Sequence, residues 1–524
     1  MLRLTSGIFA LVVSFLAATT FDANAQNRGG VLSIALNPEP ATLIMAMNLQ
    51  APTQTVAGKI YEGLIKFDFD LKPMPGLASS WSISSDGLTY TFKLQPGVKW
   101  HDGVAFTSED VAFTLTKMLP ETHPIARSTL SHIESVATPD PTTVIVKLKE
   151  PFGAFLTALA VNSAPMMPKH IYQNGDYRNN PANQKPIGTG PFKFQEWKRG
   201  EYIRLVRNDQ YRIPNKPYLD GIIFKIIPDE AARVAALEKG EIDATSFTDV
   251  EFVDVDRLTS NPKLEVTRKG YEFFSPLAWI EINERNQPFA DRRFRQALMY
   301  AIDRKFIANA IWFGSAKPAT GPVASTTVFY AGDPKAYGFD LKKANALLDE
   351  MGLAKNSSGT RATVRLLVPA YGSSLTRLGE YLKQTLGKVG IDVTLETLDP
   401  GSWAQKVSNW DYEMSINYVF QLGHPAIGVA RTYVSSNIRK IMFANTMGYS
   451  NPKVDELFAR ASDAPSDETA RKLYADVQQV LIEDVPVAWL IEINFPTIFN
   501  KRVQDLIMTA HGINDGLESA YIKQ

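Results

Sequence analysis

The stretch VRLLVPAYGSSLTRLGEYLKQTLGKVGIDVTL, residues 364–395, decides the fold class of this chain. Its apolar run at 364–368 is typical of a buried strand, and residues 391–395 alternate between apolar and polar like a second strand. Between them, residues 375–386 have the apolar spacing of a helix. A strand, a helix and a strand in this order form a parallel pair with a crossover helix. The stretch therefore predicts an α/β fold.

The chain around this stretch divides into two regions that differ in their predicted secondary structure. Helices dominate the later region: Asp229 is a predicted N-cap of a helix that ends at Gly240, residues 294–302 carry an apolar stripe, and Asp340 opens another helix. Residues 60–180 are instead rich in hairpins, such as the alternating strands at 81–94 around an Asp-Gly turn. We therefore expect two lobes that are built differently.

The N-terminus has the pattern of a secretory signal peptide. Arg3 supplies a positive charge, residues 8–18 are apolar and uncharged, and Ala23 and Ala25 supply small residues for cleavage before Gln26. The apolar run is shorter than the roughly 20 residues that a membrane span requires. We expect residues 1–25 to be removed and the mature chain to be exported as a soluble protein.

The amino-acid composition limits the cellular compartment and the binding partners that we expect for this protein. The chain has no cysteine, so it lacks the residue to which a bacterial lipoprotein attaches its lipid, and we expect a free periplasmic protein of a Gram-negative cell. Its 55 basic and 55 acidic residues balance, which disfavours a nucleic-acid or anionic-membrane partner.

A search for catalytic motifs finds none that carries a function. None of the six histidines pairs with another at metal-ligand spacing, and the chain has no P-loop and no Gly-x-Ser-x-Gly motif. The cluster Gly188-Thr189-Gly190 lacks the third glycine and the following helix of a dinucleotide site, so it predicts a tight turn. We expect no enzyme, no cofactor and no metal.

Ten short motifs, in the same order along the chain, resemble the extracellular solute-binding proteins of family 5, which serve dipeptide and oligopeptide ABC importers. They are YEGL (61–64), PGLASSW (75–81), SDGLTYTF (85–92), VKWHDG (98–103), DVAF (110–113), GTGPF (188–192), RNDQY (207–211), GEID (240–243), DRRFRQA (291–297) and AIDR (301–304).

The resemblance implies a bilobed periplasmic-binding-protein fold (type II, the large cluster C form), with a hinge between the lobes and an extra β-rich domain in the first. The implied boundaries place the first-lobe core at 26–60, 185–268 and 487–524, the extra domain at 61–184 and the second lobe at 269–486. The implied function is capture of a small solute, peptide-like or opine-like, and its delivery to an ABC permease in the inner membrane. We expect a monomer.

The resemblance also implies candidate ligand contacts. Asn37 and Glu39 follow the first strand, where family members place contacts; a solvated loop is the alternative. In the second lobe of the peptide binders, a tryptophan and an aspartate precede a proline, and the aspartate binds the peptide's amino group. Tyr418 and Gln421 stand in their places here.

An uncharged amide cannot neutralise a buried ammonium. Gln421 therefore leaves a blocked peptide, an opine-like conjugate or a sugar open as the ligand. Phe420 is a candidate contact that could equally fill the core, as could Tyr418. His424 would serve a metal chelate, with a turn residue as its alternative. Trp403 and Trp410 suit core or interlobe packing.

Two other functions stay open at this stage. A sensing or chaperone-like protein of the same fold would pass its ligand to a partner other than a transporter. A periplasmic hydrolase would need a nucleophile, a base and an orienting group, and the sequence shows no such set.

Overall fold

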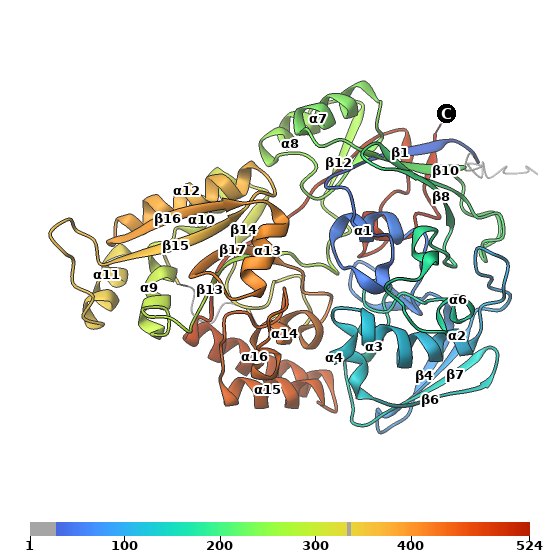
Figure 1. Ribbon diagram of the computed structural model, residues 1–524, viewed down its shortest axis with the longest axis horizontal. Helices are drawn as coiled ribbons and strands as arrows, with labels where there is room; N and C mark the ends of the chain where they lie inside the picture. The colour runs from blue at the N-terminus through green and yellow to red at the C-terminus, as the bar shows by residue number, and fades with distance from the viewer. Residues whose placement is uncertain (1–27, 333–336, 524) are drawn as a thin grey trace, which may run out of the picture.

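The computed structural model describes residues 28–332 and 337–523, which form two lobes around two mixed β-sheets (Figure 1). The predicted signal peptide, residues 1–25, lies outside the described residues. Within them, no helix combines the length and the apolar character that crossing a membrane requires.

The first lobe is built on a seven-stranded sheet. Its strand order is β12 (Leu264–Thr267), β19 (Thr497–Asn500), β11 (Ala244–Thr245), β1 (Val31–Leu36), β10 (Gly221–Ile226), β9 (Tyr202–Arg207) and β8 (Phe192–Lys198). Strand β1 runs parallel to both of its neighbours, and the other pairs are antiparallel. Helices α7 (Glu230–Lys239) and α8 (Phe252–Thr259) pack on the sheet through a separate small core that includes Leu237, Leu258 and Ile498.

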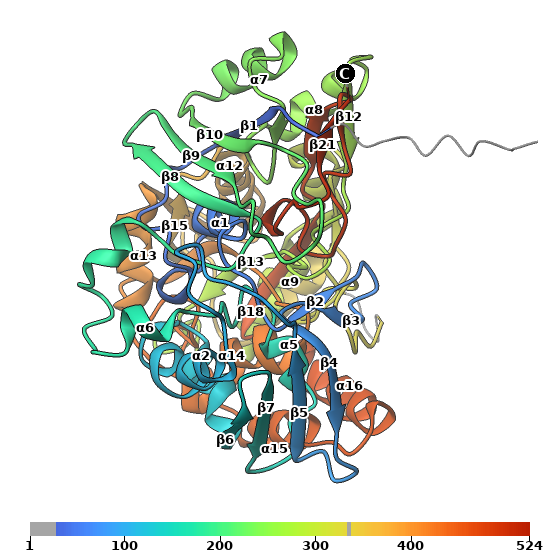
Figure 2. The ribbon, with the colours of Figure 1, turned by 90° about the vertical axis from the view of Figure 1, so that its right-hand side faces the viewer.

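The predicted extra domain contains a four-stranded antiparallel sheet, seen below the seven-stranded sheet in Figure 2. Its order is β4 (Ala78–Ile83), β5 (Thr89–Leu94), β7 (Thr143–Leu148) and β6 (Ile133–Asp140). The predicted hairpin is thus confirmed, with Tyr90, Phe92 and Leu94 facing inward. These side chains belong to one continuous core with the β1 and β10 strands, so this sheet packs as part of the first lobe.

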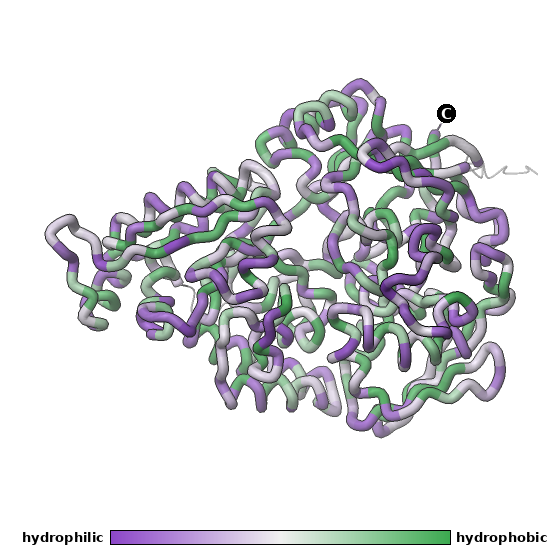
Figure 3. The backbone as a smooth tube through the Cα atoms, in the orientation of Figure 1, coloured by the Kyte–Doolittle hydropathy of each residue, from purple (hydrophilic) through white to green (hydrophobic). Residues whose placement is uncertain are grey.

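The second lobe contains the predicted strand-helix-strand unit in a six-stranded sheet. The order is β14 (Ala316–Pro318), β18 (Val487–Ile493), β13 (Leu277–Ile282), β17 (Met414–Val419), β15 (Ala362–Pro369) and β16 (Ile391–Leu398). Strands β15 and β16 are parallel and α12 (Ser373–Gly387) connects them, as predicted. Because strand side chains alternate, Leu366 packs in the core shared with α12, whereas Leu367 packs on α13 (Pro400–Ser408). Figure 3 shows hydrophobic segments running through these strands.

The predicted helix starts are confirmed where an aspartate caps the helix. As predicted, Asp229 accepts a backbone N–H bond at the start of α7, and Asp340 does so at the start of α11 (Leu341–Glu350). Asp291, for which no cap was predicted, does the same at the start of α9 (Arg292–Ala301). The remaining longer helices and their bounds are α9 (Arg292–Ala301), α11 (Leu341–Glu350), α15 (Pro452–Ser462) and α16 (Asp467–Asp484). Shorter helices are α1 (Ala51–Ala57), α2 (Ser108–Phe113), α3 (Leu119–Thr122), α4 (Ala126–Thr129), α5 (Phe155–Ala158), α6 (Lys169–Tyr172), α10 (Arg304–Phe306) and α14 (Ala430–Tyr433). Two small ribbons pair β2 (Ile65–Phe67) with β3 (Pro73–Pro75), and β20 (Val503–Gln504) with β21 (Tyr521–Ile522).

The chain crosses between the lobes twice, from β12 to β13 and from β18 to β19. Since β12 pairs with β19 and β13 pairs with β18, the two crossing segments lie side by side. The Arg268 Nη1 donates to the Asn494 carbonyl at 2.9 Å between them. The return to the first lobe, predicted near residue 487, falls after Ile493, because β18 still belongs to the second-lobe sheet. Only the short segment 494–496, which contains Asn494 and Pro496, separates β18 from β19 at this crossing.

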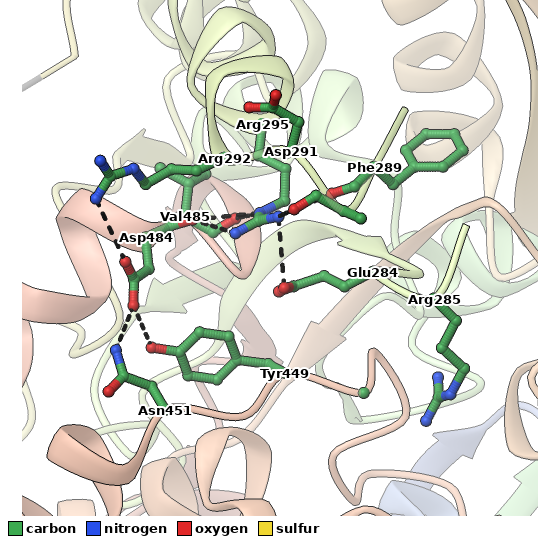
Figure 4. Close-up of polar contacts among 12 residues, drawn as sticks. Glu284, Arg285, Phe289, Asp291, Arg292, Arg295, Tyr449, Asn451, Asp484 and Val485 are labelled. Atoms are coloured by element: carbon green, nitrogen blue, oxygen red, sulfur yellow. Dashed lines mark hydrogen bonds and ion pairs between the residues drawn. The ribbon is translucent and has the colours of Figure 1, made fainter. Parts of the chain in front are cut away.

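The DRRFRQA motif builds a buried charge cluster at the start of α9, which we call the Arg295 cluster (Figure 4). The Arg295 guanidinium donates to the carbonyls of Phe289 and Asp484 at 2.8 Å and of Val485 at 2.9 Å. It also forms an ion pair with Glu284 at 3.4 Å, and burial raises the pKa of that carboxyl to about 7. The motif therefore fastens α9 to the end of α16, a structural role.

Candidate ligand-binding site

A cavity of about 300 Å³ lies between the lobes. Its first-lobe wall comes from residues 36–38, 49–52, 54–55 and 246–249. Its second-lobe wall comes from residues 369, 371, 403–404, 417–420, 422, 431 and 442–443. Because both lobes contribute, a change in the angle between them changes the shape of this site.

The wall segments follow the ends of parallel strands in both sheets. In the first lobe, β1 and β11 are parallel neighbours, and the segments that follow them hold Asn37 and Asp249. In the second lobe, β15 and β17 are parallel neighbours, and Tyr371 and Phe420 follow them. Ligands of α/β proteins bind outside the carboxyl ends of such strands. In both sheets, the edge that faces the cavity is thus the one at the carboxyl ends of parallel strands.

The wall is mainly apolar and rich in aromatic rings. Tyr371, Trp403, Tyr418 and Phe420 come from the second lobe, and Phe247 comes from the first. The Phe247 and Phe420 rings lie 6.1 Å apart, so they meet across the boundary between the lobes. Trp403 is buried and donates its Nε1–H to Ser415 at 2.9 Å, which agrees with the expected packing role while one face lines the cavity.

Asp249 is the acidic side chain among the described residues that line the cavity. Its Oδ2 accepts the Ser246 N–H at 3.0 Å, and burial raises the pKa of this carboxyl to about 7. Asp249 is therefore only partly ionised at neutral pH.

Arg431 is the basic side chain among those described residues, and it has no carboxylate partner there. Its guanidinium donates to the carbonyls of Phe420 at 3.1 Å, Gly428 at 3.2 Å and Phe443 at 3.5 Å. Burial lowers the pKa of Arg431 to about 10, which leaves the side chain charged at neutral pH. The site therefore carries a positive charge that backbone carbonyls and the Phe443 ring stabilise, without a carboxylate of the described residues.

Three of the six predicted site residues line the cavity and three lie elsewhere. Asn37, Tyr418 and Phe420 are part of the wall. Glu39 instead accepts the Trp197 Nε1–H at 2.7 Å, so it fastens the loop after β1 to strand β8. His424 is buried, accepts the Ala426 N–H at 3.1 Å, and its pKa falls to about 3 because of burial. His424 thus serves the turn that was its alternative, away from the cavity.

Gln421, the position at which the resemblance predicts the main contact, also lies outside the cavity wall. Its Oε1 accepts from the Ala324 N–H at 2.8 Å and the Thr327 hydroxyl at 2.9 Å, and its Nε2 donates to the Pro322 carbonyl at 2.8 Å. The side chain is 1% exposed. Its polar atoms are therefore satisfied by the loop after β14, which counts against a ligand contact.

Sequence reasoning missed Asp249, Tyr371 and Arg431. Tyr371 directly follows the predicted strand at 364–368, so the rule of carboxyl-end loops would have found it. Asp249 follows a strand of only two residues, which is too short to show the alternation of apolar and polar residues by which a strand is predicted. Arg431 lies on a helix of a single turn, which is likewise too short to show a helical pattern. Among the described residues, no group of three His, Cys, Asp or Glu side chains is arranged to hold a metal ion.

One further contact joins the two lobes beside the cavity. Glu251, in the first lobe, accepts the Ser373 N–H at 2.7 Å and pairs with Arg377 at 3.0 Å, both at the start of α12 in the second lobe. A carboxylate at a helix N-terminus is stabilised by the unpaired N–H groups there.

Comparison with known proteins gives this geometry its context. The model of the bacterial extracellular solute-binding proteins, family 5 (middle), matches residues 72–439. The chain belongs to family 5 of these solute-binding proteins. The family, the bilobed fold and the solute-binding class predicted from the motifs are thereby confirmed.

Relatives within family 5 cover nearly the whole chain. It is 31% identical over 446 residues to the glutathione-binding protein GsiB of Pectobacterium atrosepticum, covering 84% of each chain. Among solved structures, it resembles the oligopeptide-binding protein AppA of Bacillus subtilis in complex with a nonapeptide (27% identity, 95% of this chain, 100% of that chain, TM-score 0.84). It also resembles AgaA of A. tumefaciens R10 in complex with agropinic acid (27% identity, 94% and 99% coverage, TM-score 0.82).

Proposed function

We propose that this family 5 protein is the substrate-binding component of an ABC importer. It captures a small solute between its lobes and delivers it to a permease in the inner membrane. The single observation that carries this proposal is the cavity whose walls come from both lobes. The paired crossing segments supply the hinge about which the lobes close on the solute.

The proposed compartment is the periplasm, and the proposed working form is a monomer. The signal-peptide pattern at residues 1–25 and the lack of a cysteine for lipid attachment support an exported protein without an anchor. The proposed activity is binding without chemical change of the solute, as for its relatives in family 5.

The proposed solute is small and peptide-like or opine-like. A cavity of about 300 Å³ is at the lower end of the range of roughly 300–1,000 Å³ that small-molecule sites occupy. That size suits a ligand such as glutathione or agropinic acid, which relatives bind, better than a nonapeptide. Aromatic rings on both walls would hold an apolar part of the solute.

Native mass spectrometry of the protein purified without denaturation, followed by a thermal-shift screen of peptides, opines and sugars, tests the proposal. A ligand present at a hundred times its dissociation constant stabilises the fold by about 2.7 kcal/mol. The expected result is a solute that binds one to one and is released unchanged. A solute released in altered form would reveal an enzyme and contradict the proposal.

A further inference from the structure

The charge balance of the cavity sets a condition on its ligand. Arg431 is charged at neutral pH and meets no carboxylate of the described residues, whereas Asp249 is only partly ionised. A guanidinium has five N–H donors, and three contacts to carbonyls leave two of them for a ligand. The two free N–H donors of Arg431 and its uncompensated charge both favour a ligand group with two anionic oxygens, such as a carboxylate.

We infer that the solute carries a carboxylate that binds Arg431, and an apolar body that lies against the aromatic rings of the cavity. This inference rests on the proposed function and names its substrate class: a small organic acid such as an acylated amino acid, a short peptide or an opine. Arginine and carboxylate form two parallel hydrogen bonds, a geometry that neutral ligands cannot reproduce.

The other ligand classes fit this cavity less well. A cationic ligand would be repelled by Arg431 and would find in Asp249 a carboxylate whose Oδ2 is already bonded to Ser246. A neutral sugar needs many hydrogen-bonding groups, but most of the wall is apolar. Leaving the buried guanidinium beside a neutral ligand would also forgo the interaction that offsets its desolvation.

Pairs of acids and their amides test the inference directly. The probes are N-acetylphenylalanine, Gly-Phe and Ala-Ala-Phe, each as the free acid and as the C-terminal amide, with glucose and phenethylamine as neutral and cationic references. Calorimetric titration of the full mature chain measures each dissociation constant. We expect at least one acid to bind, and its amide to bind about 30-fold more weakly or worse, as for loss of one partner of a buried ion pair.

Variants assign the effect to one side chain. R431Q should bind the acid about 30-fold more weakly and no longer distinguish acid from amide. R431K should retain part of the preference because it keeps the charge. R460Q is the matched control, since Arg460 is exposed on α15 and bonds only to Glu456 on the same helix. Circular dichroism confirms that each variant is folded, and the acid–amide comparison on the unmodified chain needs no variant.

The outcomes separate this inference from the proposed function. An amide or glucose that binds as tightly as the acids, or an R431Q protein with unchanged affinity for an acid, would overturn the carboxylate inference while the binding function stands. No binding by any probe of the three classes would count against both.

Discussion

Two arginines of the second lobe, Arg295 and Arg431, bind backbone carbonyls in the same way but differ in the charges around them. Arg295 donates to four carbonyls and also pairs with Glu284. Arg431 donates to three carbonyls and pairs with no carboxylate of the described residues. The first lies in a packed cluster between α9 and α16, and the second lines the cavity.

This difference separates a structural cation from one that is available to a ligand. A guanidinium surrounded by protein must be neutralised within the fold, because an unpaired buried charge costs several kcal/mol. A guanidinium at a cavity can take its counter-charge from a bound molecule. The same residue type therefore fastens the second lobe at one place and selects a solute at another.

The largest expected effect is on stability, from Arg295→Met. The substitution leaves the Glu284 carboxyl and four carbonyls without their donor, so we expect the free energy of unfolding to fall by about 3–5 kcal/mol. Urea unfolding followed by circular dichroism measures it. Arg460→Met is the control, since its ion pair with Glu456 is exposed and is worth about 1 kcal/mol or less. A loss below about 1 kcal/mol for Arg295→Met would remove the contrast between the two arginines.

The next effect comes from Gln421→Leu. The Ala324 N–H and the Pro322 carbonyl lose their partners, and one unsatisfied buried group costs about 1–3 kcal/mol. We expect a loss of about 2–3 kcal/mol in urea unfolding, with the dissociation constant for a bound acid changed less than about threefold. The reverse pattern, weaker binding at unchanged stability, would make Gln421 the ligand contact predicted from the sequence.

The pH dependence of stability sharpens the comparison, because each region holds one buried carboxyl with a raised pKa. The folded-state pKa is about 7 for both Glu284 and Asp249, against ordinary values of 4.5 and 3.8. Between these values and pH 7 these two carboxyls hold fewer protons in the unfolded chain than in the folded chain, so their contribution to the free energy of unfolding falls as pH rises.

Glu284→Gln and Asp249→Asn should each flatten that fall, by an amount on the order of 2 kcal/mol. Urea unfolding at a series of pH values from about 4 to 8 measures the slope, the range set by the two pKa limits. Glu468→Gln, at an exposed position on α16, serves as the control. An unchanged slope in both variants would show that these carboxyls titrate normally.

The smallest expected effect on stability comes from Arg431→Met. The variant loses three hydrogen bonds to carbonyls but also loses the cost of burying a charge that no protein carboxylate balances, so we expect a change within about 1 kcal/mol. Urea unfolding under the conditions used for Arg295→Met gives the comparison. A loss above about 3 kcal/mol would make Arg431 a structural group of the same kind as Arg295.

Most of the fold could be predicted because it depends on local patterns. The strand-helix-strand unit at 364–395, the capping aspartates and the hairpin at 81–94 are each set by residues close together in the chain. The second crossing could be predicted only approximately, since just three residues, 494–496, lie between a strand of one sheet and a strand of the other.

The site could be predicted only in part. Asn37, Tyr418 and Phe420 follow from the position of loops after strands and from the family resemblance. The resemblance also gives the position of Gln421, but not the direction of its side chain, which the loop after β14 determines. The charge of Arg431 is visible in the sequence, whereas its lack of a carboxylate partner depends on packing among segments far apart in the chain.

Strand β19 lies between β11 and β12, although the whole second lobe separates it from both in sequence. All six strands of the second-lobe sheet, in contrast, come from one continuous stretch of the chain, from Leu277 to Ile493. During synthesis, the second lobe can therefore assemble before the first-lobe sheet receives its inserted strand, and pairings between distant segments form slowly. A chain truncated before Thr497 would keep the six-stranded sheet complete but leave β12 without its partner, so the seven-stranded sheet is the last of the two sheets to be completed.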